Sequence, residues 1–383
     1  MEYDYVIVGG GPAGSVLASR LSENSQYRVC LLEAGETDNR LLINVPFGFA
    51  ATVPTKIFNW AFDTTPQAGL NGRRGYQPRG KALGGSSSIN AQVYIRGHRS
   101  DYDHWEKLGN PGWSYADVLP YFKKAEHNET LVNDFHGQGG PHNVAEVRSP
   151  NVFLAGLLDS AERNGFKLNR DFNGTDQDGL GWYQVNQKNG QRCNVAGAYL
   201  TPARQRPNLE VVTGAHATRI LLNNREAVGV EYRRGSATVQ VRAAREVILC
   251  AGALQSPQLL MLSGIGPEDE LKKFGISVTH NLPGVGGNLQ DHIDCSLSYR
   301  TKDASLIGWT FKNIFNGLPA AFEYRKKRTG LYSSNLAQAG GFLRTLPDLD
   351  CPDVQFHFEP TMMDDHGRKI VLGNGYCGHV CVL

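Results

Sequence analysis

The sequence has no hydrophobic run of membrane-spanning length and no excess of charge of either sign. Its 383 residues include 39 Lys and Arg against 37 Asp and Glu, which gives a formal net charge of +2. A transmembrane helix needs about eighteen or more consecutive apolar residues, and no stretch approaches that length. Nucleic-acid binding needs a concentrated positive surface, so the near balance of charge argues against a nucleic-acid partner.

The N-terminus lacks the basic and apolar regions of a secretory signal peptide. The seven cysteines are odd in number and form no Cys-x-x-Cys pair, which is typical of reduced thiols. Cys377, His379 and Cys381 would share one face of a strand, but no fourth ligand is evident, so packing is favoured over a metal site and no metal is expected. We therefore expect a cytoplasmic protein. The basic run 325–328 leaves peripheral contact with the inner membrane open, although a solvated helix end explains it more simply.

Glycine is the abundant residue, with 44 positions scattered along the chain, and this indicates backbone that approaches a ligand closely. The first 35 residues predict a strand over 5–8, a Gly-rich turn over 9–14, a helix and a second buried strand over 28–32. That β-α-β order predicts an α/β fold, α+β overall, that opens with a doubly wound parallel sheet.

Later segments carry weaker signals. Residues 36–150 show no regular periodicity. Ser149-Pro150 marks the expected start of an amphipathic helix with Phe153, Leu154, Leu157, Leu158 and Ala161 on one face. Three β-like runs over 209–212, 227–232 and 247–250 predict a small antiparallel insertion that leads into a buried strand, and 354–358 predicts a half-exposed strand.

The Gly-rich turn from Gly9 to Gly14 fits the pattern G-x-G-x-x-G. Gly9 permits the tight turn, Gly11 lets the backbone touch a diphosphate, and Gly14 allows close packing of helix and strand. Glu33, at the end of the next strand, can accept hydrogen bonds from both hydroxyls of an adenosine ribose and would repel a 2′-phosphate. The context predicts a dinucleotide site that disfavours NADP, against the alternative of a turn without a ligand.

Three further stretches are rich in glycine. In residues 79–90, two glycines and three serines expose backbone N–H groups that suit an anion or the edge of a polar ring, although an ordinary turn is as well supported. After the strand ending at Cys250, Ser256-Pro257 predicts the N-cap and first-turn proline of a helix. Residues 283–292 are too glycine-rich for regular structure.

Together these stretches resemble the glucose–methanol–choline (GMC) oxidoreductase family. Gly84-Gly85-Ser86-Ser87 and Asn90, within residues 80–103, resemble its first signature, residues 252–266 its second, and 283–292 a third recurrent segment. The N-terminal dinucleotide motif completes a set of four motifs across nearly the whole chain. Residues 187–192 and 365–368 resemble the branch of acceptor-dependent alcohol dehydrogenases and choline dehydrogenases.

The resemblance implies a Rossmann-like FAD-binding domain over 1–150 and 201–298, with a FAD-covering excursion at about 36–110. It also implies a sheet-based substrate-binding domain over 151–200 and 299–383. Family members carry the catalytic histidine and a second His or Asn in a C-terminal segment, so we expect a chain truncated before it and name no catalytic residue. Four histidines of this chain could replace the missing catalytic base, but a structural role is favoured for each: His98, His292, His357 and His379.

The implied cofactor is FAD, and the position of the histidine that binds it covalently in some relatives is Ile89, so we expect non-covalent FAD. The resemblance implies oxidation of a primary alcohol to an aldehyde by hydride transfer to the flavin N5, with an acceptor such as a quinone rather than oxygen. The implied cofactor-binding residues are Gly9, Gly11, Pro12, Ala13, Gly14, Glu33, Ala34, Gly84, Gly85, Ser86, Asn90, Ala91, Gln92, Val93, Ala217 and Gly252.

Choline-oxidising relatives carry a Glu in the pattern Glu-x-Gly-x-Phe, and the matching position is Gln338. Loss of that anion removes a Coulomb attraction for a cation, so a neutral alcohol is favoured and Gln338 is predicted to contact the substrate. Choline dehydrogenase activity and a catalytically inert FAD-binding fragment remain as alternatives. A pyridine-nucleotide disulfide reductase is rejected, because no early cysteine pair is present and residues 284–286 lack a third glycine.

Overall fold

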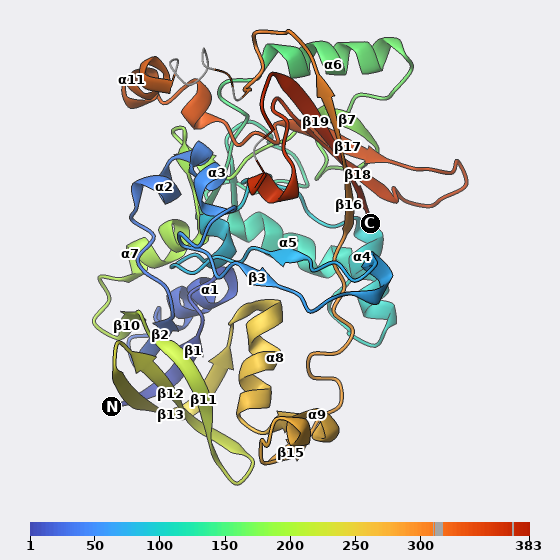
Figure 1. Cartoon of the computed structure of the whole chain (residues 1–383). Helices are drawn as coiled ribbons and strands as arrows, with labels where there is room; N and C mark the ends of the chain where they lie inside the picture. The colour runs from blue at the N-terminus through green and yellow to red at the C-terminus, as the bar shows by residue number, and fades with distance from the viewer. Residues whose placement is uncertain (309, 311–316, 370) are drawn as a thin grey trace.

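The computed structural model describes residues 1–308, 310, 317–369 and 371–383. Two sheets form its halves: a six-stranded sheet that holds the N-terminus and a five-stranded sheet near the C-terminus (Figure 1). Residues 36–150 lie largely between them and supply short strands and helices. None of the helices in the described ranges combines the length and the apolar character that a membrane crossing requires.

The six-stranded sheet contains the predicted parallel β1–β2 pair. β1 lies between β2 and β13 and pairs parallel with both. In sheet order the strands are β10 (Leu209–Thr213), β2 (Val29–Glu33), β1 (Glu2–Val8), β13 (Ala237–Leu249), β12 (Glu226–Arg234) and β11 (His216–Asn223).

The antiparallel insertion differs from the prediction in its members. β10 pairs parallel with β2 and so extends the main sheet, whereas the insertion consists of β11, β12 and the first part of β13. β11 was not predicted because Ile220 is its one buried residue among exposed and half-buried neighbours. β13 is long enough to pair with β12 at its start and with β1 at its end.

Both faces of the parallel sheet are buried, as expected for strands with helices on either side. Ile7 and Leu31 pack with Ala18 of α1 (Pro12–Leu21) on one face. Val6 and Leu32 face the other way and pack in a cluster that includes residues of β11–β13 and of α8 (Gly252–Leu262). The alternation of side chains along each strand thus fixes which helix lies on which face.

The five-stranded sheet is antiparallel, and α6 covers one of its faces (Figure 1). Leu154 and Leu158 of α6 pack against Leu180 and Ala339. The strand order is β16 (Ile293–Arg300), β19 (Gly375–Val382), β18 (Val354–Glu359), β17 (Ala339–Leu343) and β7 (Gly179–Trp182).

The start of α6 (Val152–Arg163) corrects the prediction made from Ser149-Pro150. Asn151 is the N-cap, and its side-chain oxygen accepts a hydrogen bond from the backbone N–H of Phe153. Asn is among the best N-cap residues, so the helix starts after Asn151 and not at the proline.

Two helices in the segment 36–150 were missed. They are α4 (Arg99–Lys107) and α5 (Tyr115–Ala125). Neither helix has a buried residue, and α5 contains Pro120, so the apolar periodicity that identifies a helix in a sequence is weak in both. Their starts are capped by the side chains of His98 and Ser114.

The other helices and strand pairs are short. The further helices are α2 (Leu41–Asn44), α3 (Phe49–Thr52), α7 (Thr201–Ala203), α9 (Glu268–Lys273) and α11 (Gly317–Lys327). The strand pairs are β3 (Phe62–Asp63) with β4 (Tyr76–Gln77), β5 (Glu126–Asn128) with β6 (His142–Val144), β8 (Gln187–Lys188) with β9 (Gln191–Arg192), and β14 (Ile265–Gly266) with β15 (His280–Asn281).

Candidate functional site

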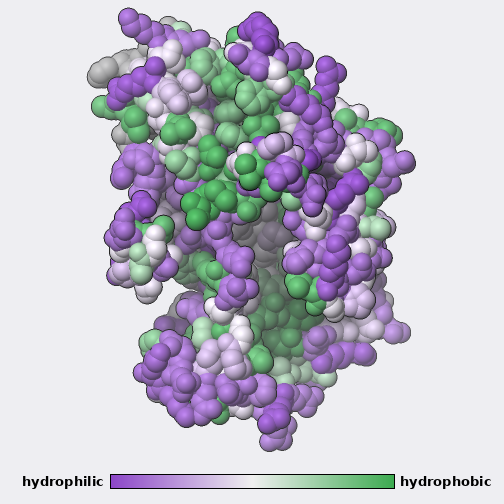
Figure 2. Space-filling model, turned by 90° about the vertical axis from the view of Figure 1, so that its right-hand side faces the viewer, coloured by the Kyte–Doolittle hydropathy of each residue, from purple (hydrophilic) through white to green (hydrophobic). Residues whose placement is uncertain are grey.

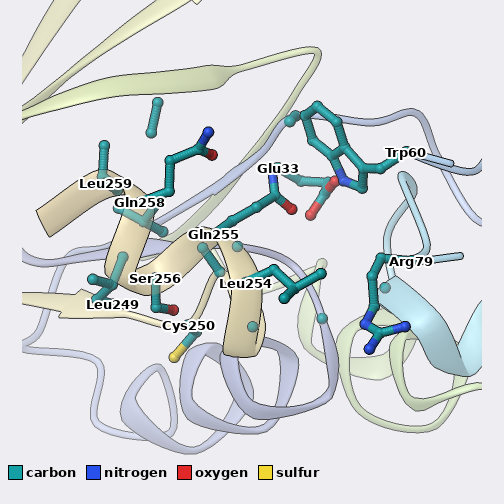
Figure 3. A pocket seen from close by; sticks show the side chains of 18 of the residues that line it. Glu33, Trp60, Arg79, Leu249, Cys250, Leu254, Gln255, Ser256, Gln258 and Leu259 are labelled. Atoms are coloured by element: carbon teal, nitrogen blue, oxygen red, sulfur yellow. The ribbon is translucent and has the colours of Figure 1, made fainter. Parts of the chain in front are cut away.

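A cavity of about 880 Å³ lies at the carboxyl ends of β1, β2 and β13, where α1 and α8 begin (Figure 3). This edge of a parallel sheet is where α/β proteins bind nucleotides. The molecular surface is hollowed between the two halves of the protein, and apolar side chains line the hollow (Figure 2). The predicted cofactor residues that line the cavity are Gly9, Gly11, Pro12, Ala13, Glu33, Ala34, Gly85, Ser86, Ala217 and Gly252.

Glycines form the floor of this cavity. A Cβ atom on Gly14 would lie 2.0 Å from the carbonyl oxygen of Gly9, so Gly14 does not line the cavity but lets α1 pack against the end of β1. A Cβ on Gly11 would meet no atom closer than the Cα of Gly85, at 3.9 Å. Gly11 is also the N-cap of α1 and provides no capping side chain. Space and the unpaired N–H groups of a helix N-terminus therefore coincide here, which fits a diphosphate.

Glu33 closes one side of the cavity (Figure 3). Its two carboxylate oxygens accept hydrogen bonds from the backbone N–H groups of Gly10 and Gly35, each at 2.7 Å. Burial raises the pKa of Glu33 to about 7, against the opposing effect of these hydrogen bonds. Each carboxylate oxygen has a second lone pair, so Glu33 can still accept hydrogen bonds from ribose hydroxyls.

Aromatic residues at this end of the cavity were missed in the sequence. Trp60 stacks on Phe62 with ring centroids 5.7 Å apart, and the His216 ring lies 5.3 Å from Trp60. The Lys81 ammonium lies 4.3 Å from the centroid of the Trp60 ring. Ala217, predicted to contact adenine, follows His216 in β11. Flat apolar surface beside these residues suits a purine ring.

The start of α8 corrects a second helix prediction. α8 begins at Gly252, its N-cap is Ala251, and Pro257 lies inside it, so Ser256 is not the N-cap. Gly252 has a φ of +85°, a conformation that glycine adopts without strain. The helix therefore starts directly at the edge of the sheet, and residues 252–256 line the cavity.

The predicted flavin-side residues continue away from the cavity lining. Gly84 has a φ of +85° and donates its N–H to the Gly10 carbonyl at 2.7 Å, which ties the loop to the dinucleotide turn. Asn90 is exposed, and the Ala91 carbonyl accepts a hydrogen bond from the Asn335 side chain at 2.8 Å. Gln92 is buried with a φ of +61°, and Val93 bridges to Val185.

Behind this loop lies Arg192, another residue that the sequence did not identify. It is 7% exposed, and its guanidinium donates hydrogen bonds to the carbonyl oxygens of Ile43, Ser87 and Asn90 at 2.8–3.1 Å. It also donates to the side-chain oxygen of Asn90 at 2.8 Å. Arg192 therefore fixes the loop from its buried side.

The side chain of Gln338, the predicted substrate contact, is buried and makes three hydrogen bonds within the protein. Its side-chain oxygen accepts from the N–H of Asn151 at 2.9 Å, and its NH₂ group donates to the Ser149 carbonyl and the Ser334 hydroxyl. With 2% exposure and these three partners, Gln338 joins the start of α6 to the loop that precedes β17. The prediction that it contacts the substrate therefore finds no support in this geometry.

The face of the five-stranded sheet opposite α6 carries a cluster of ionisable side chains. Register places His357 beside His379 and Asp294 beside Cys381, so these four residues share one face. The His379 Nδ1 lies 2.7 Å from an Asp294 oxygen, and its Nε2 lies 3.9 Å from an oxygen of buried Glu359. We call Asp294, His357, Glu359 and His379 the inner-face cluster.

The surroundings of the inner-face cluster shift the pKa values of its members. Burial raises the pKa of Glu359, whereas burial and neighbouring His379 lower the pKa of His357 to about 4. Burial alone would lower the pKa of His379, but the hydrogen bond that its ring N–H donates to Asp294 and the charge of Glu359 raise it to about 11. In the described residues, the Glu359 Oε2 and His379 Nε2 atoms are buried without a hydrogen-bond partner.

Two further histidines and two cysteines were singled out in the sequence. His98 caps α4, with its Nδ1 accepting from the N–H of Ser100, and His292 is exposed. Cys381 donates weakly to Asp294 at 3.8 Å, and Cys377 is buried in β19. Within the described ranges, no group of three or more His, Cys, Asp or Glu residues is arranged to hold a metal ion.

Known proteins match this chain over its whole length. The alcohol dehydrogenase (acceptor) of Pseudomonas putida is 48% identical, and the match covers 100% of this chain and 70% of the relative. The oxygen-dependent choline dehydrogenase of Pectobacterium atrosepticum is 42% identical, over 99% and 69%. A formate oxidase structure from Aspergillus oryzae RIB40, which concerns FAD modification, superposes with a TM-score of 0.89 at 26% identity, over 100% and 72%.

The chain also matches the model of a protein family. The model for GMC oxidoreductase matches residues 3–294, a range that contains the whole dinucleotide cavity and the loop held by Arg192. The chain spans about 70% of the length of the relatives named above. With the dinucleotide turn, Gly85-Ser86 and the start of α8 gathered at one sheet edge, this chain belongs to the GMC oxidoreductase family.

Proposed function

We propose that the chain binds FAD non-covalently and serves the oxidation of a primary alcohol to an aldehyde. The observation that carries this proposal is the single cavity in which the side-chain-free surface of Gly11 and Gly85, the N-terminus of α1 and the Glu33 carboxylate meet. Membership of the family supports it, and so does the alcohol dehydrogenase name of the 48% identical relative.

The residues divide the cofactor between them. Gly9, Gly11, Pro12 and Ala13 would hold the diphosphate, because a helix N-terminus attracts anions. Glu33 and Ala34 would bind the ribose, and Ala217 the adenine. Gly84 to Ser86 would continue along the diphosphate, and residues 90–93 would lie beside the flavin. At the position that precedes Asn90, the apolar Ile89 offers no group for a covalent flavin bond, which favours non-covalent binding.

FAD, when bound, would take up the hydride that leaves the alcohol carbon. The chain's own contribution is to enclose and orient the reacting partners. The hollow between the two sheets provides apolar surface for the alcohol chain (Figure 2). The inner-face cluster provides two polar atoms that have no hydrogen-bond partner among the described residues, Glu359 Oε2 and His379 Nε2, to which a hydroxyl can bind.

A second candidate activity is choline oxidation, favoured by one specific observation. Glu359 and Asp294 bring two carboxylates to the inner face of the substrate sheet, and a cationic substrate would be attracted to that charge. We rank a neutral primary alcohol first because the relative with 48% identity is named for alcohol and the choline relative is 42% identical.

We further propose an acceptor other than oxygen, such as a quinone, and a peripheral contact with anionic lipid. Leu318 and Phe322, one helical turn apart on α11, are 74% and 65% exposed, and the helix ends in the basic run 325–328. Exposed apolar residues beside basic ones favour a lipid surface. For the two-domain division we propose a boundary before Ile293 in place of the one expected after residue 298, because β16 pairs with β19 along its full length.

The experiment is to express the chain, record its absorption in the flavin bands, and follow dye reduction with 1-butanol and with choline. We expect bound flavin that acid precipitation releases, and faster reduction with butanol. Bound flavin with no reduction by either alcohol would identify an inert FAD-binding module. A chain that folds but takes up no flavin would contradict the proposal.

A further inference from the structure

Arg192 carries a buried positive charge that the protein does not neutralise. Its hydrogen bonds run to the Ile43, Ser87 and Asn90 carbonyls and the Asn90 side chain, all of which are neutral acceptors. No ion pair links it to a carboxylate within the described part of the chain, and its Nη2 atom there is buried without a partner. Burying an unpaired charge is costly, so the position needs an anion nearby or another compensating function.

The contact with Asn90 fixes which end of that amide faces the guanidinium. An arginine has only donors, so the Asn90 atom 2.8 Å from Nη1 must be the oxygen. The backbone N–H of Gln92 donates to the same oxygen at 3.1 Å, which makes the assignment doubly determined. The NH₂ group of Asn90 must then point away from Arg192.

Asn90 is exposed on that outer side, whereas Arg192 is 7% exposed. Asn90 lies two residues after the turn over Gly85–Ser88, and Gly85 and Ser86 line the dinucleotide cavity. The two N–H bonds of Asn90, which meet no acceptor among the described residues, therefore lie on the exposed side of the loop, opposite Arg192.

We propose that Arg192 is a positioning residue that orients Asn90 as a hydrogen-bond donor to the flavin and favours the negatively charged reduced flavin over the oxidised one. The inference rests on the proposed binding of FAD. The reduced isoalloxazine ring is anionic near neutral pH, so a positive charge and an aligned donor behind the loop stabilise it more than the neutral oxidised ring. The reduced cofactor would then provide the negative charge that Arg192 lacks among the described residues.

The test measures the midpoint potential of bound FAD and its dissociation constant in the FAD-loaded chain. Arg192→Met removes the charge and the orientation of Asn90, Asn90→Ala removes the donor alone, and Arg192→Lys keeps the charge. We expect a lower midpoint potential for Arg192→Met and Asn90→Ala, and a value nearer the wild type for Arg192→Lys. We also expect FAD affinity to weaken on the order of tenfold in Arg192→Met.

Arg206→Met is the matched control. Arg206 also donates to neutral groups, including the Ser22 hydroxyl at 2.8 Å, but it lies at the C-terminal end of α1, whereas the cavity lies at the N-terminal end. The midpoint potential of FAD bound to Arg206→Met should equal that of FAD bound to the wild type. Wild-type potentials in both Arg192→Met and Asn90→Ala would overturn the inference while leaving FAD binding intact. If Arg192→Met does not fold, Asn90→Ala and Arg192→Lys decide. A wild-type chain that binds no FAD would instead refute the proposed function.

Discussion

The two sheets of this protein present polar groups in opposite ways. At the edge of the six-stranded sheet the site consists of backbone: glycines, a helix N-terminus and one acid whose oxygens accept from Gly10 and Gly35. On the inner face of the five-stranded sheet it consists of side chains, with Asp294, His379 and Glu359 close together. A backbone site depends on absent Cβ atoms, whereas a side-chain site depends on strand register.

The contrast extends to the helices that pack on each sheet. Gly14 in α1 has no room for a side chain, because its Cβ would lie 2.0 Å from the Gly9 carbonyl oxygen. Gly156 in α6 borders an apolar cavity of about 840 Å³ and has no atom within 4 Å of a Cβ position. α1 therefore packs directly against backbone atoms at the end of β1, whereas α6 packs on its sheet through larger side chains.

The largest expected effect is that of Gly14→Ala. The new methyl group must displace either α1 or the turn after β1, so we expect a loss of stability of about 3 kcal/mol or more and no retained flavin. Urea unfolding followed by far-UV circular dichroism measures the first and absorption the second. A variant as stable as the wild type would mean that α1 does not pack on β1 as described.

The next largest effects on stability are expected at two buried carboxylates, Glu33 and Glu359. Glu33→Gln leaves one of the Gly10 and Gly35 N–H groups facing an NH₂ group, so we expect a loss of about 1–3 kcal/mol. Glu359→Gln removes no hydrogen bond made by the described residues, and Asp294 still holds the His379 proton when the charge of Glu359 is lost, so we expect a smaller loss. Urea unfolding at pH 8 measures both, and the comparison fails if Glu359→Gln costs more than Glu33→Gln.

The inner-face cluster should make stability depend on pH. Asp294 and Glu359 hold the His379 proton more tightly in the folded protein, with a pKa of about 11 against 6.5 for an ordinary histidine. This stabilisation is complete below about pH 6.5 and is lost as the pH rises toward 11. We expect His379→Gln to destabilise the chain more at pH 6 than at pH 10, as measured by urea unfolding. An equal difference at both pH values would exclude a proton-linked role for His379.

Gly156→Ala gives the smallest effect and the opposite sign to Gly14→Ala. The methyl group enters open space, and alanine favours a helix over glycine, so we expect a gain of about 0.5–1 kcal/mol. Thermal unfolding detects this as a rise in the melting temperature. A loss of stability would show that α6 lies closer to the sheet than the structure places it.

The same contrast explains how much the sequence predicted. The unit β1–α1–β2 and Glu33 were predicted because strand, turn and helix follow one another directly and glycine spacing has one physical meaning there. α6 was predicted with its start two residues early, because the proline was taken as part of the helix although Asn151 is the cap. For α8, Ser256-Pro257 imitated a start that in fact lies at Gly252.

The residues missed at the site share a physical reason. Trp60 and Lys81 meet only because the β3 and loop segments fold back on the six-stranded sheet, and Arg192 reaches Asn90 across about a hundred residues of chain. Asp294 and His379 become neighbours only through the β16–β19 register. The contacts of Gln338 could not be predicted for the same reason, since the sequence showed its type but not that Ser149 and Asn151 bind its amide.

The central claim is that a diphosphate lies against the bare backbone at Gly11, and Gly11→Ala tests it most directly. Its Cβ would meet no protein atom closer than 3.9 Å, so the fold should tolerate it, yet the methyl group would stand where the diphosphate is proposed to bind. The measurement is a calorimetric titration of FAD into the flavin-free wild-type chain and the variant. We predict one FAD per wild-type chain and no measurable binding by an equally stable Gly11→Ala. Equal affinity in both proteins would contradict the account.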